Sequence, residues 1–198
     1  MIKAILFDWG GVLSKGRHTD TIIRLIDSRY KTQIALERSF VGKLMDKMDS
    51  NTLDFDEFAK KVNKKFKINI SVDEMDEIFQ KAILSVDNEL IDVIKKIKSK
   101  YRVILASNNN PKTVSILRTK YGELLNLFEK TYFSFEIKLC KPNKEFFLYI
   151  LKELKLKKEN VLFIDDKLEN IQSAEKIGIK SIQFESNTQI IKKLSKFL

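Results

Sequence analysis

Short apolar runs alternate with helical patterns along most of this chain, and this alternation constrains the fold more than any other feature. Four runs are rich in Ile, Val, Leu or Phe, and a fifth, weaker run fits a shorter strand. They are Ala4–Phe7, Val103–Ala106, Val161–Ile164 and Ser181–Phe184, with Thr131–Phe135 as the weaker run. Runs that are apolar throughout predict strands buried on both faces of a parallel sheet. The sequence therefore predicts an α/β fold, a three-layer sandwich with a parallel Rossmann-like sheet.

One long segment interrupts this alternation. In residues 19–86 no strand-like run occurs, and apolar residues recur at helical spacing. Ser71 and Glu74 have the spacing of a capping box, and Asp54 and Glu57 form a looser version, so each pair predicts the start of a helix. We therefore expect an all-helical insert after the first strand.

The insert divides the chain into two expected domains. Residues 1–16 and 87–198 form the core domain, and residues 17–86 form a small helical cap. A chain of 198 residues is long enough for one sizeable core that carries a smaller insert.

Polar residues follow the predicted strands, and in a parallel α/β sheet ligands bind beyond the carboxyl ends of the strands. In chain order these residues are Asp8 and Gly10, then Ser107 and Asn108, then Lys141, then Asp165 and Asp166. The sheet topology places carboxylates, a hydroxyl and an ammonium group at one edge of the sheet.

This set of groups supports phosphoryl transfer. An ionised Asp8 can attack an electrophilic phosphorus or carbon atom. Because Asp8, Asp165 and Asp166 repel one another, they require a cation, and an all-oxygen ligand set with open positions favours Mg²⁺. Lys141 can neutralise a phosphate and keep the nucleophile ionised, and the Ser107 hydroxyl can bind phosphate oxygens. The expected reaction passes through a covalent aspartyl intermediate.

Four segments, in this order, resemble the motifs of the haloacid dehalogenase-like (HAD) hydrolase superfamily: FDWGGVL, LASNNN, CKPNKEFF and FIDDKLENI. The resemblance covers the whole chain, because the helical insert is similar to the C1 cap of that superfamily. The first motif, FDxGxV, resembles that of sugar 1-phosphatases and of the phosphatase domain of soluble epoxide hydrolases. The resemblance implies a Mg²⁺-dependent phosphatase that acts on a small phosphorylated metabolite, for example a sugar phosphate.

The resemblance also implies a role for each matching residue. The catalytic residues are Asp8, which forms the aspartyl-phosphate, and Lys141. The residues that contact substrate phosphate are Trp9, Ser107, Asn108 and Lys141. The residues that hold Mg²⁺ are Asp8, Gly10 through its carbonyl, Asp165 and Asp166. Asn170 occupies a position where the family often has a further Asp or Asn that supports the metal.

Gly10 departs from the family pattern. Most family phosphatases have a second Asp at this position, which acts as general acid and base. Glycine can neither protonate a leaving group nor activate water, and such help is typically worth ~10²–10⁴-fold in rate. Either the enzyme is slow, or its substrate has a good leaving group, or another residue or the substrate itself supplies the proton. His18, the one histidine in the sequence, is a candidate for that residue.

Two other functions remain open. A non-catalytic binding or regulatory protein would keep the fold and lose turnover with the second Asp. A 2-haloacid dehalogenase needs no metal and does not use an Asp pair after the fourth strand, so Asp165 and Asp166 speak against it.

The composition bears on partners and compartment. Lys and Arg exceed Asp and Glu by 37 to 27, but most of the basic residues are lysines interleaved with apolar and acidic residues. This pattern is typical of solvated helix faces, so no nucleic-acid partner is expected. No apolar stretch approaches the ~18 residues of a membrane span. The single Cys140 forbids an intrachain disulfide and favours the cytoplasm.

Overall fold

The computed structural model describes residues 1–83 and 85–197, and a five-stranded parallel sheet lies at its centre. The strands run in the order β3-β2-β1-β4-β5. Their bounds are β1 (Ala4–Phe7), β2 (Arg102–Ser107), β3 (Lys130–Phe133), β4 (Val161–Asp165) and β5 (Lys180–Gln183). The expected α/β fold with a parallel sheet is confirmed.

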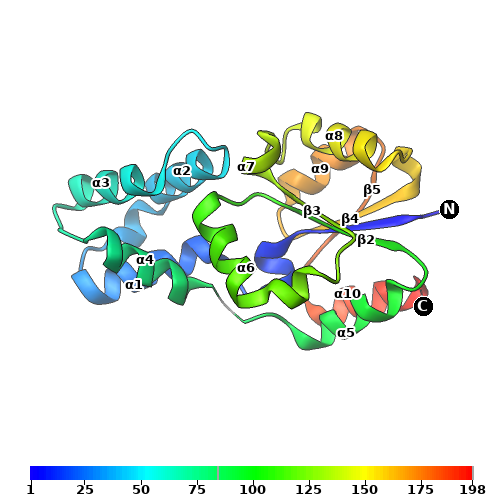
Figure 1. Ribbon diagram of the computed structural model, residues 1–198, viewed down its shortest axis with the longest axis horizontal. Helices are drawn as coiled ribbons and strands as arrows, with labels where there is room; N and C mark the ends of the chain where they lie inside the picture. Colours follow the sequence, from blue (N-terminus) through cyan, green and yellow to red (C-terminus); the bar gives the residue numbers. More distant parts are fainter. Residues whose placement is uncertain (84, 198) are drawn as a thin grey trace.

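Helices cover both faces of the sheet, which gives three layers (Figure 1). One face packs against α5 (Asn88–Ile97), α6 (Pro111–Leu125) and α10 (Asn187–Leu194). The other packs against α8 (Lys144–Leu154) and α9 (Leu168–Lys176). Alternate residues of β1 enter the two layers, with Ile5 and Phe7 on one side and Ala4 and Leu6 on the other.

The register of the sheet sets the position of the polar strand ends. Phe7 of β1 lies opposite Leu105 of β2 and Ile164 of β4. Asp8, the residue after β1, and Asp165, the last residue of β4, therefore lie at the same level along the two strands.

Four of the five expected strands differ from the observed ones by one or two residues at an end. The third observed strand ends at Phe133, and Ser134 begins α7 (Ser134–Ile137). Here the Ser134 hydroxyl, with its single proton, lies within hydrogen-bond distance of the Asp49 carbonyl at the end of α2 (Arg38–Asp49) and of the Asn109 carbonyl, so a polar contact replaces the apolar strand. The strand expected at Ser181–Phe184 begins one residue earlier. It lies at an edge of the sheet and is partly exposed, whereas burial on both faces was expected.

The helical insert has a hydrophobic core of its own. It consists of α1 (His18–Tyr30), α2 (Arg38–Asp49), α3 (Phe55–Phe66) and α4 (Val72–Ala82). The expected caps are present: the Ser71 side chain accepts from the backbone of Glu74 in a complete capping box, and Asp54 accepts from Glu57. The separate core supports the division at residues 17 and 86, which stays a prediction.

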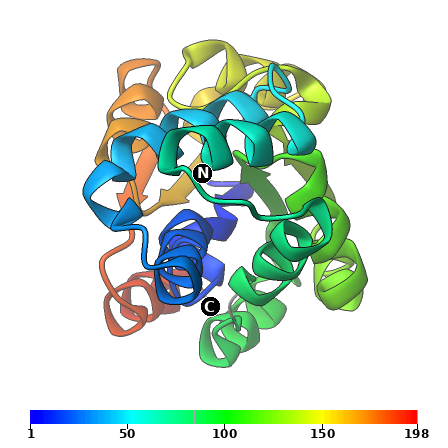
Figure 2. The ribbon, with the colours of Figure 1, turned by 90° about the vertical axis from the view of Figure 1, so that its left-hand side faces the viewer.

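The insert lies over the carboxyl ends of the strands. The first strand runs from the N-terminus, at the right of Figure 1, toward α1–α4. Figure 2, seen from the insert, shows these helices in front of the sheet. We call this insert the cap. Within the described residues, no helix combines the length and the apolar character needed to cross a membrane.

Candidate active site

Asp8 follows the last residue of the central strand, and the residue is 7% exposed. Its Oδ1 lies 3.0 Å from Nζ of Lys141, and the Ser107 hydroxyl hydrogen-bonds to the same carboxylate. Burial raises the pKa of Asp8 to about 6, Lys141 opposes that rise, and the neighbouring charge of Asp165 adds to it. Lys141 and Ser107 therefore hold a buried carboxylate in its ionised form.

Lys141 is a buried ammonium group shared between two carboxylates. Its Nζ lies 2.6 Å from Oδ2 of Asp165 and 3.0 Å from Oδ1 of Asp8, and it donates to the Ala106 carbonyl at 2.9 Å. Burial by itself would lower the pKa of Lys141, but Asp165 and Asp8 outweigh it and raise this pKa above its usual value. The Ala106 carbonyl and Asp165 accept hydrogen bonds from Nζ, whereas Asp8 lies at ion-pair distance and its Oδ1 accepts no hydrogen bond from the described residues.

Asn108 positions Lys141 rather than pointing freely at a substrate. Its Nδ2 donates to the Lys141 carbonyl at 2.8 Å, and its Oδ1 accepts from the Lys141 backbone N–H at 2.9 Å. This paired contact ties the end of β2 to the loop that carries the lysine. The expected phosphate contact of Asn108 stays a prediction, and with the side chain engaged it would pass through the backbone.

Asp165 is the most deeply buried carboxylate of the site. It is fully buried, and its Oδ1 accepts from the Lys167 backbone N–H and from Nδ2 of Asn170, both at 2.9 Å. Its Oδ2 accepts from Lys141. Asn170 therefore supports Asp165 through its Nδ2, while its buried Oδ1 has no hydrogen-bond partner among the described residues.

Asp166 has one engaged and one free oxygen. Its Oδ2 accepts from Arg17, with Nε at 2.8 Å and Nη2 at 2.7 Å. Its Oδ1 is buried and has no hydrogen-bond partner in the part of the chain that the structure describes. The sequence did not identify Arg17, because no motif links it to a partner 149 residues away.

The three carboxylates fit a hard divalent cation. One oxygen from each of Asp8, Asp165 and Asp166 lies within 4.8 Å of the others. Carboxylate oxygens are the ligands that Mg²⁺ and similar ions prefer. Three buried oxygens at this site lack a hydrogen-bond donor among the described residues, and a bound cation would satisfy such oxygens: Asp8 Oδ1, Asp166 Oδ1 and Asn170 Oδ1. Gly10, whose carbonyl is expected to contribute, lines a cavity together with Asp8.

Gly11 lies in the turn Trp9–Leu13 at a position that tolerates no side chain. Its φ is +77°, and a Cβ there would lie 2.6 Å from Oδ2 of Asp166. Gly11→Ala should therefore lower the free energy of unfolding by about 1–2 kcal/mol from the left-handed backbone alone, and displace Asp166. The matched control is Gly10→Ala, because a Cβ at Gly10 meets nothing within 4 Å. Urea denaturation of both variants measures this, and equal losses of stability would contradict it.

Trp9 directs its ring away from the position where a phosphate is expected. The indole is buried in the core and packs against Tyr121 of α6, with ring centroids 5.6 Å apart. Any contact of Trp9 with phosphate would therefore use its backbone.

His18 is poorly suited to act as a general acid. Its Nε2 lies 3.3 Å from the Phe79 carbonyl and donates to it, and its Nδ1 lies 3.5 Å from the Thr113 hydroxyl. Burial lowers the pKa of His18 to about 4. The imidazole is therefore neutral at pH 7, and its N–H is already used.

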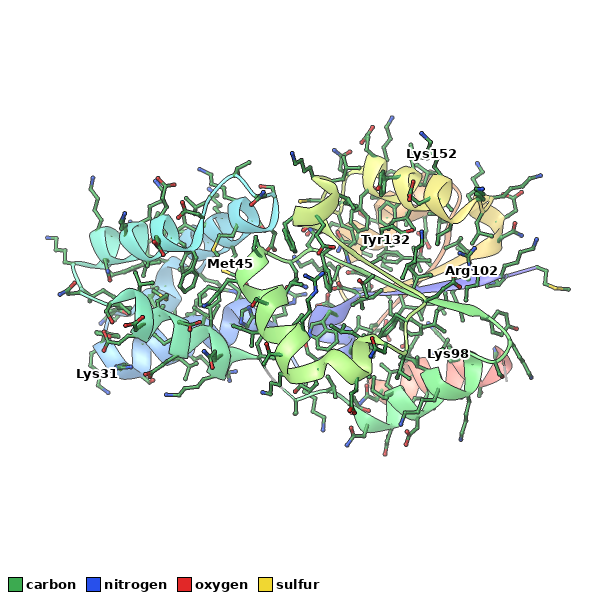
Figure 3. The ribbon with its side chains drawn as sticks, viewed as in Figure 1. Lys31, Met45, Lys98, Arg102, Tyr132 and Lys152 are labelled. Atoms are coloured by element: carbon green, nitrogen blue, oxygen red, sulfur yellow. The ribbon has the colours of Figure 1, made fainter. Side chains whose placement is uncertain are left out.

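A cavity of about 110 Å³ joins the strand ends to the cap. Asp8 and Lys141 line it from the core, and Met45, Asp46 and Asp49 line it from α2. Met45, labelled in Figure 3, lies in the cap half of the molecule and is buried. Asp49 was not predicted as a site residue from the sequence. One signal was available: an aspartate in the last turn of a helix is opposed by the helix dipole, so it needs another reason to be there.

The parallel sheet, the carboxylates at its strand ends and the helical cap together define an α/β protein with a capped, acidic site at the carboxyl edge of its sheet. The chain belongs to the haloacid dehalogenase-like hydrolase family, whose model it matches over residues 2–178. The resemblance drawn from the four sequence segments is thereby confirmed.

Individual relatives agree with this assignment. A D-ribitol-5-phosphate phosphatase from Bacteroides thetaiotaomicron is 26% identical over 194 residues, which cover 94% of this chain and 93% of the relative. A HAD-like family hydrolase from Porphyromonas gingivalis has a similar fold, with a TM-score of 0.80, 24% identity and coverage of 99% and 97%. So does a HAD family enzyme from B. thetaiotaomicron in complex with magnesium and inorganic phosphate, with a TM-score of 0.81, 22% identity and coverage of 94% and 96%.

Proposed function

We propose that this protein is a Mg²⁺-dependent phosphatase that hydrolyses the phosphate monoester of a small polyol or sugar. The observation that carries the proposal is the buried Asp8 carboxylate, held ionised by Lys141 beside the unpartnered oxygen of Asp166. The similarity to a D-ribitol-5-phosphate phosphatase supports the substrate class. The similar fold seen in complex with magnesium and phosphate supports a site of this kind.

In the first half of the reaction, an Asp8 oxygen attacks phosphorus and the bond between phosphorus and the ester oxygen breaks. Lys141 and the Ser107 hydroxyl both contact the Asp8 carboxylate. Phosphoryl oxygens that approach Asp8 would therefore come close to both groups. Their positive charge and donated hydrogen bond stabilise the charge that develops there, and such groups act strongly because they are positioned in advance.

In the second half, water attacks the phosphorus of the aspartyl-phosphate, the bond to Asp8 breaks, and inorganic phosphate leaves. Mg²⁺ held by Asp8, Asp166 and the Gly10 carbonyl, with Asp165 direct or through water, would neutralise charge on the phosphoryl oxygens. Asp165 also fixes the direction of Lys141, since it accepts the shortest of the three lysine contacts.

Gly10 favours a second candidate, a non-catalytic protein that binds phosphorylated molecules. A single measurement separates the two: release of inorganic phosphate from 4-nitrophenyl phosphate, whose phenolate leaves readily, and from a panel of polyol and sugar phosphates. We expect release that requires Mg²⁺. Binding of phosphate without release from any ester would favour the non-catalytic protein. Turnover of 2-haloacids in excess chelator would revive the dehalogenase.

A further inference from the structure

The proposed function leaves one chemical requirement unmet. An alkyl phosphate such as a polyol phosphate has a poor leaving group, which needs a proton as the ester bond breaks. Gly10 carries no carboxyl group, and His18 is neutral with its N–H engaged by Phe79. A donor for this proton is therefore sought among the other residues that line the cavity.

Asp49 is a carboxyl group on that wall, and it comes from the cap. It is the last residue of α2, and it lines the same cavity as Asp8, Ser107 and Lys141. Asp8 lines the cavity from the core, whereas Asp49 lines it from the cap. Asp46, one turn earlier on the same helix, also lines the cavity, but it is exposed.

Asn110 fixes the carboxyl group of Asp49. Asn110 is 1% exposed, and its Oδ1 accepts from the Thr113 backbone N–H at 2.9 Å, where it caps α6. Because its oxygen is committed to the helix, its Nδ2 has to be the atom that faces Asp49, and it donates to Oδ1 of Asp49 at 3.0 Å. The Asp49 carbonyl also accepts from the Ser134 hydroxyl at 2.7 Å. Asn110 and Ser134 of the core domain thus hold Asp49 of the cap in its position at the cavity.

We propose that Asp49 is the general acid and base that the first motif lacks, supplied by the cap and positioned by Asn110. As Asp8 attacks phosphorus and the ester bond breaks, the Asp49 carboxyl gives its proton to the departing alkoxide, which leaves as the alcohol. The Asp49 carboxylate then takes a proton from the water that attacks the aspartyl-phosphate. The bond to Asp8 breaks, phosphate leaves, and Asp49 is protonated again for the next turnover.

The surroundings of Asp49 suit both halves of this cycle. Burial raises the pKa of Asp49 to about 7; the hydrogen bond from Asn110 and the charge of Lys167 oppose the rise, and the charges of Asp46 and Asp8 add to it. A group that titrates near neutral pH can both give and accept a proton at the working pH.

The test is Asp49→Asn, compared on two esters. An asparagine can still accept the hydrogen bond from Asn110, so the cap stays seated, but it carries no proton to give. We expect kcat for D-ribitol 5-phosphate to fall by about 10²–10³-fold, in line with the usual worth of general acid catalysis. We expect kcat for 4-nitrophenyl phosphate to change by less than about threefold, because its leaving group needs no proton.

Two further readouts separate catalysis from a structural role. With the ribitol ester, the wild-type rate should decline as pH rises through about 7, where Asp49 loses its proton, and Asp49→Asn should lack that decline. Gly10→Asp added to Asp49→Asn should restore part of the lost rate, since a Cβ at Gly10 meets nothing within 4 Å. Asp73→Asn, at an exposed acid of cap helix α4 that does not line the cavity, is the matched control, and it should leave the ratio of the two substrates unchanged.

The outcomes are distinct. An equal loss on both esters in Asp49→Asn, or no loss on either, would overturn the role of Asp49 while the phosphatase activity stands. No phosphate release by the wild-type protein from either ester with Mg²⁺ present would overturn the proposed function itself, and this inference with it.

Discussion

Asp8→Asn should abolish phosphate release, to below ~10⁻³ of the wild-type rate on every substrate. An amide is nearly isosteric with a carboxylate, but it is a far poorer nucleophile. The change removes one of the contacts of Lys141, which keeps Asp165 and the Ala106 carbonyl. The fold should therefore survive, and the thermal unfolding midpoint should stay within a few degrees of that of the wild-type protein.

A trapping experiment makes this prediction specific to Asp8. Wild-type protein quenched in acid during turnover should carry one extra phosphoryl group on the peptide that contains Asp8, as mass spectrometry would detect. Asp8→Asn should carry none. A variant that retains a tenth or more of the wild-type rate, or a phosphoryl group on another residue, would mean that Asp8 is not the nucleophile.

The core of this site could be predicted because the sheet topology does most of the positioning. Once the apolar runs are assigned to parallel strands, their ends must meet at one edge, and Asp8 and Asp165 leave the sheet at the same level. Lys141 follows a strand only at a distance, and the motif resemblance rather than strand geometry identified it.

The rest of the site depends on pairs that no local pattern reveals. Arg17 meets Asp166 across 149 residues, and Asp49 meets Asn110 across 61. Helical spacing shows which face of a cap helix is buried, but it does not fix how the cap is seated on the core. The end of α2 could therefore not be placed at the cavity, although LASNNN already contained Asn110.

The observed end of the third strand reflects the same limit. Apolar character alone predicted a third strand that ends at Phe135. The observed strand ends at Phe133, and the hydroxyl of the next residue, Ser134, lies within hydrogen-bond distance of the Asp49 and Asn109 carbonyls. That contact joins core to cap, so a long-range interaction ends a strand that local propensity would have continued.

Asp166→Ala should weaken Mg²⁺ binding at least ten times more than Asn170→Ala. Asp166 offers a buried Oδ1 with no donor among the described residues, so its loss removes a ligand. Asn170 is a neutral amide that hydrogen-bonds to Asp165, and loss of such a supporting contact typically costs ~10–100-fold in metal affinity. Asp92→Ala, an exposed acid of α5, is the matched control and should leave the affinity unchanged.

Calorimetric titration with Mg²⁺ measures these affinities without any need for turnover. The rate of phosphate release against Mg²⁺ concentration gives a second value for each variant, and the two should rank the variants in the same order. In excess chelator, release should fall to background in all of them, because the clustered carboxylates would then repel the phosphoryl group. Full activity without metal would show that Lys141 and Arg17 alone offset the charge of these carboxylates, and the Mg²⁺ site would be wrong.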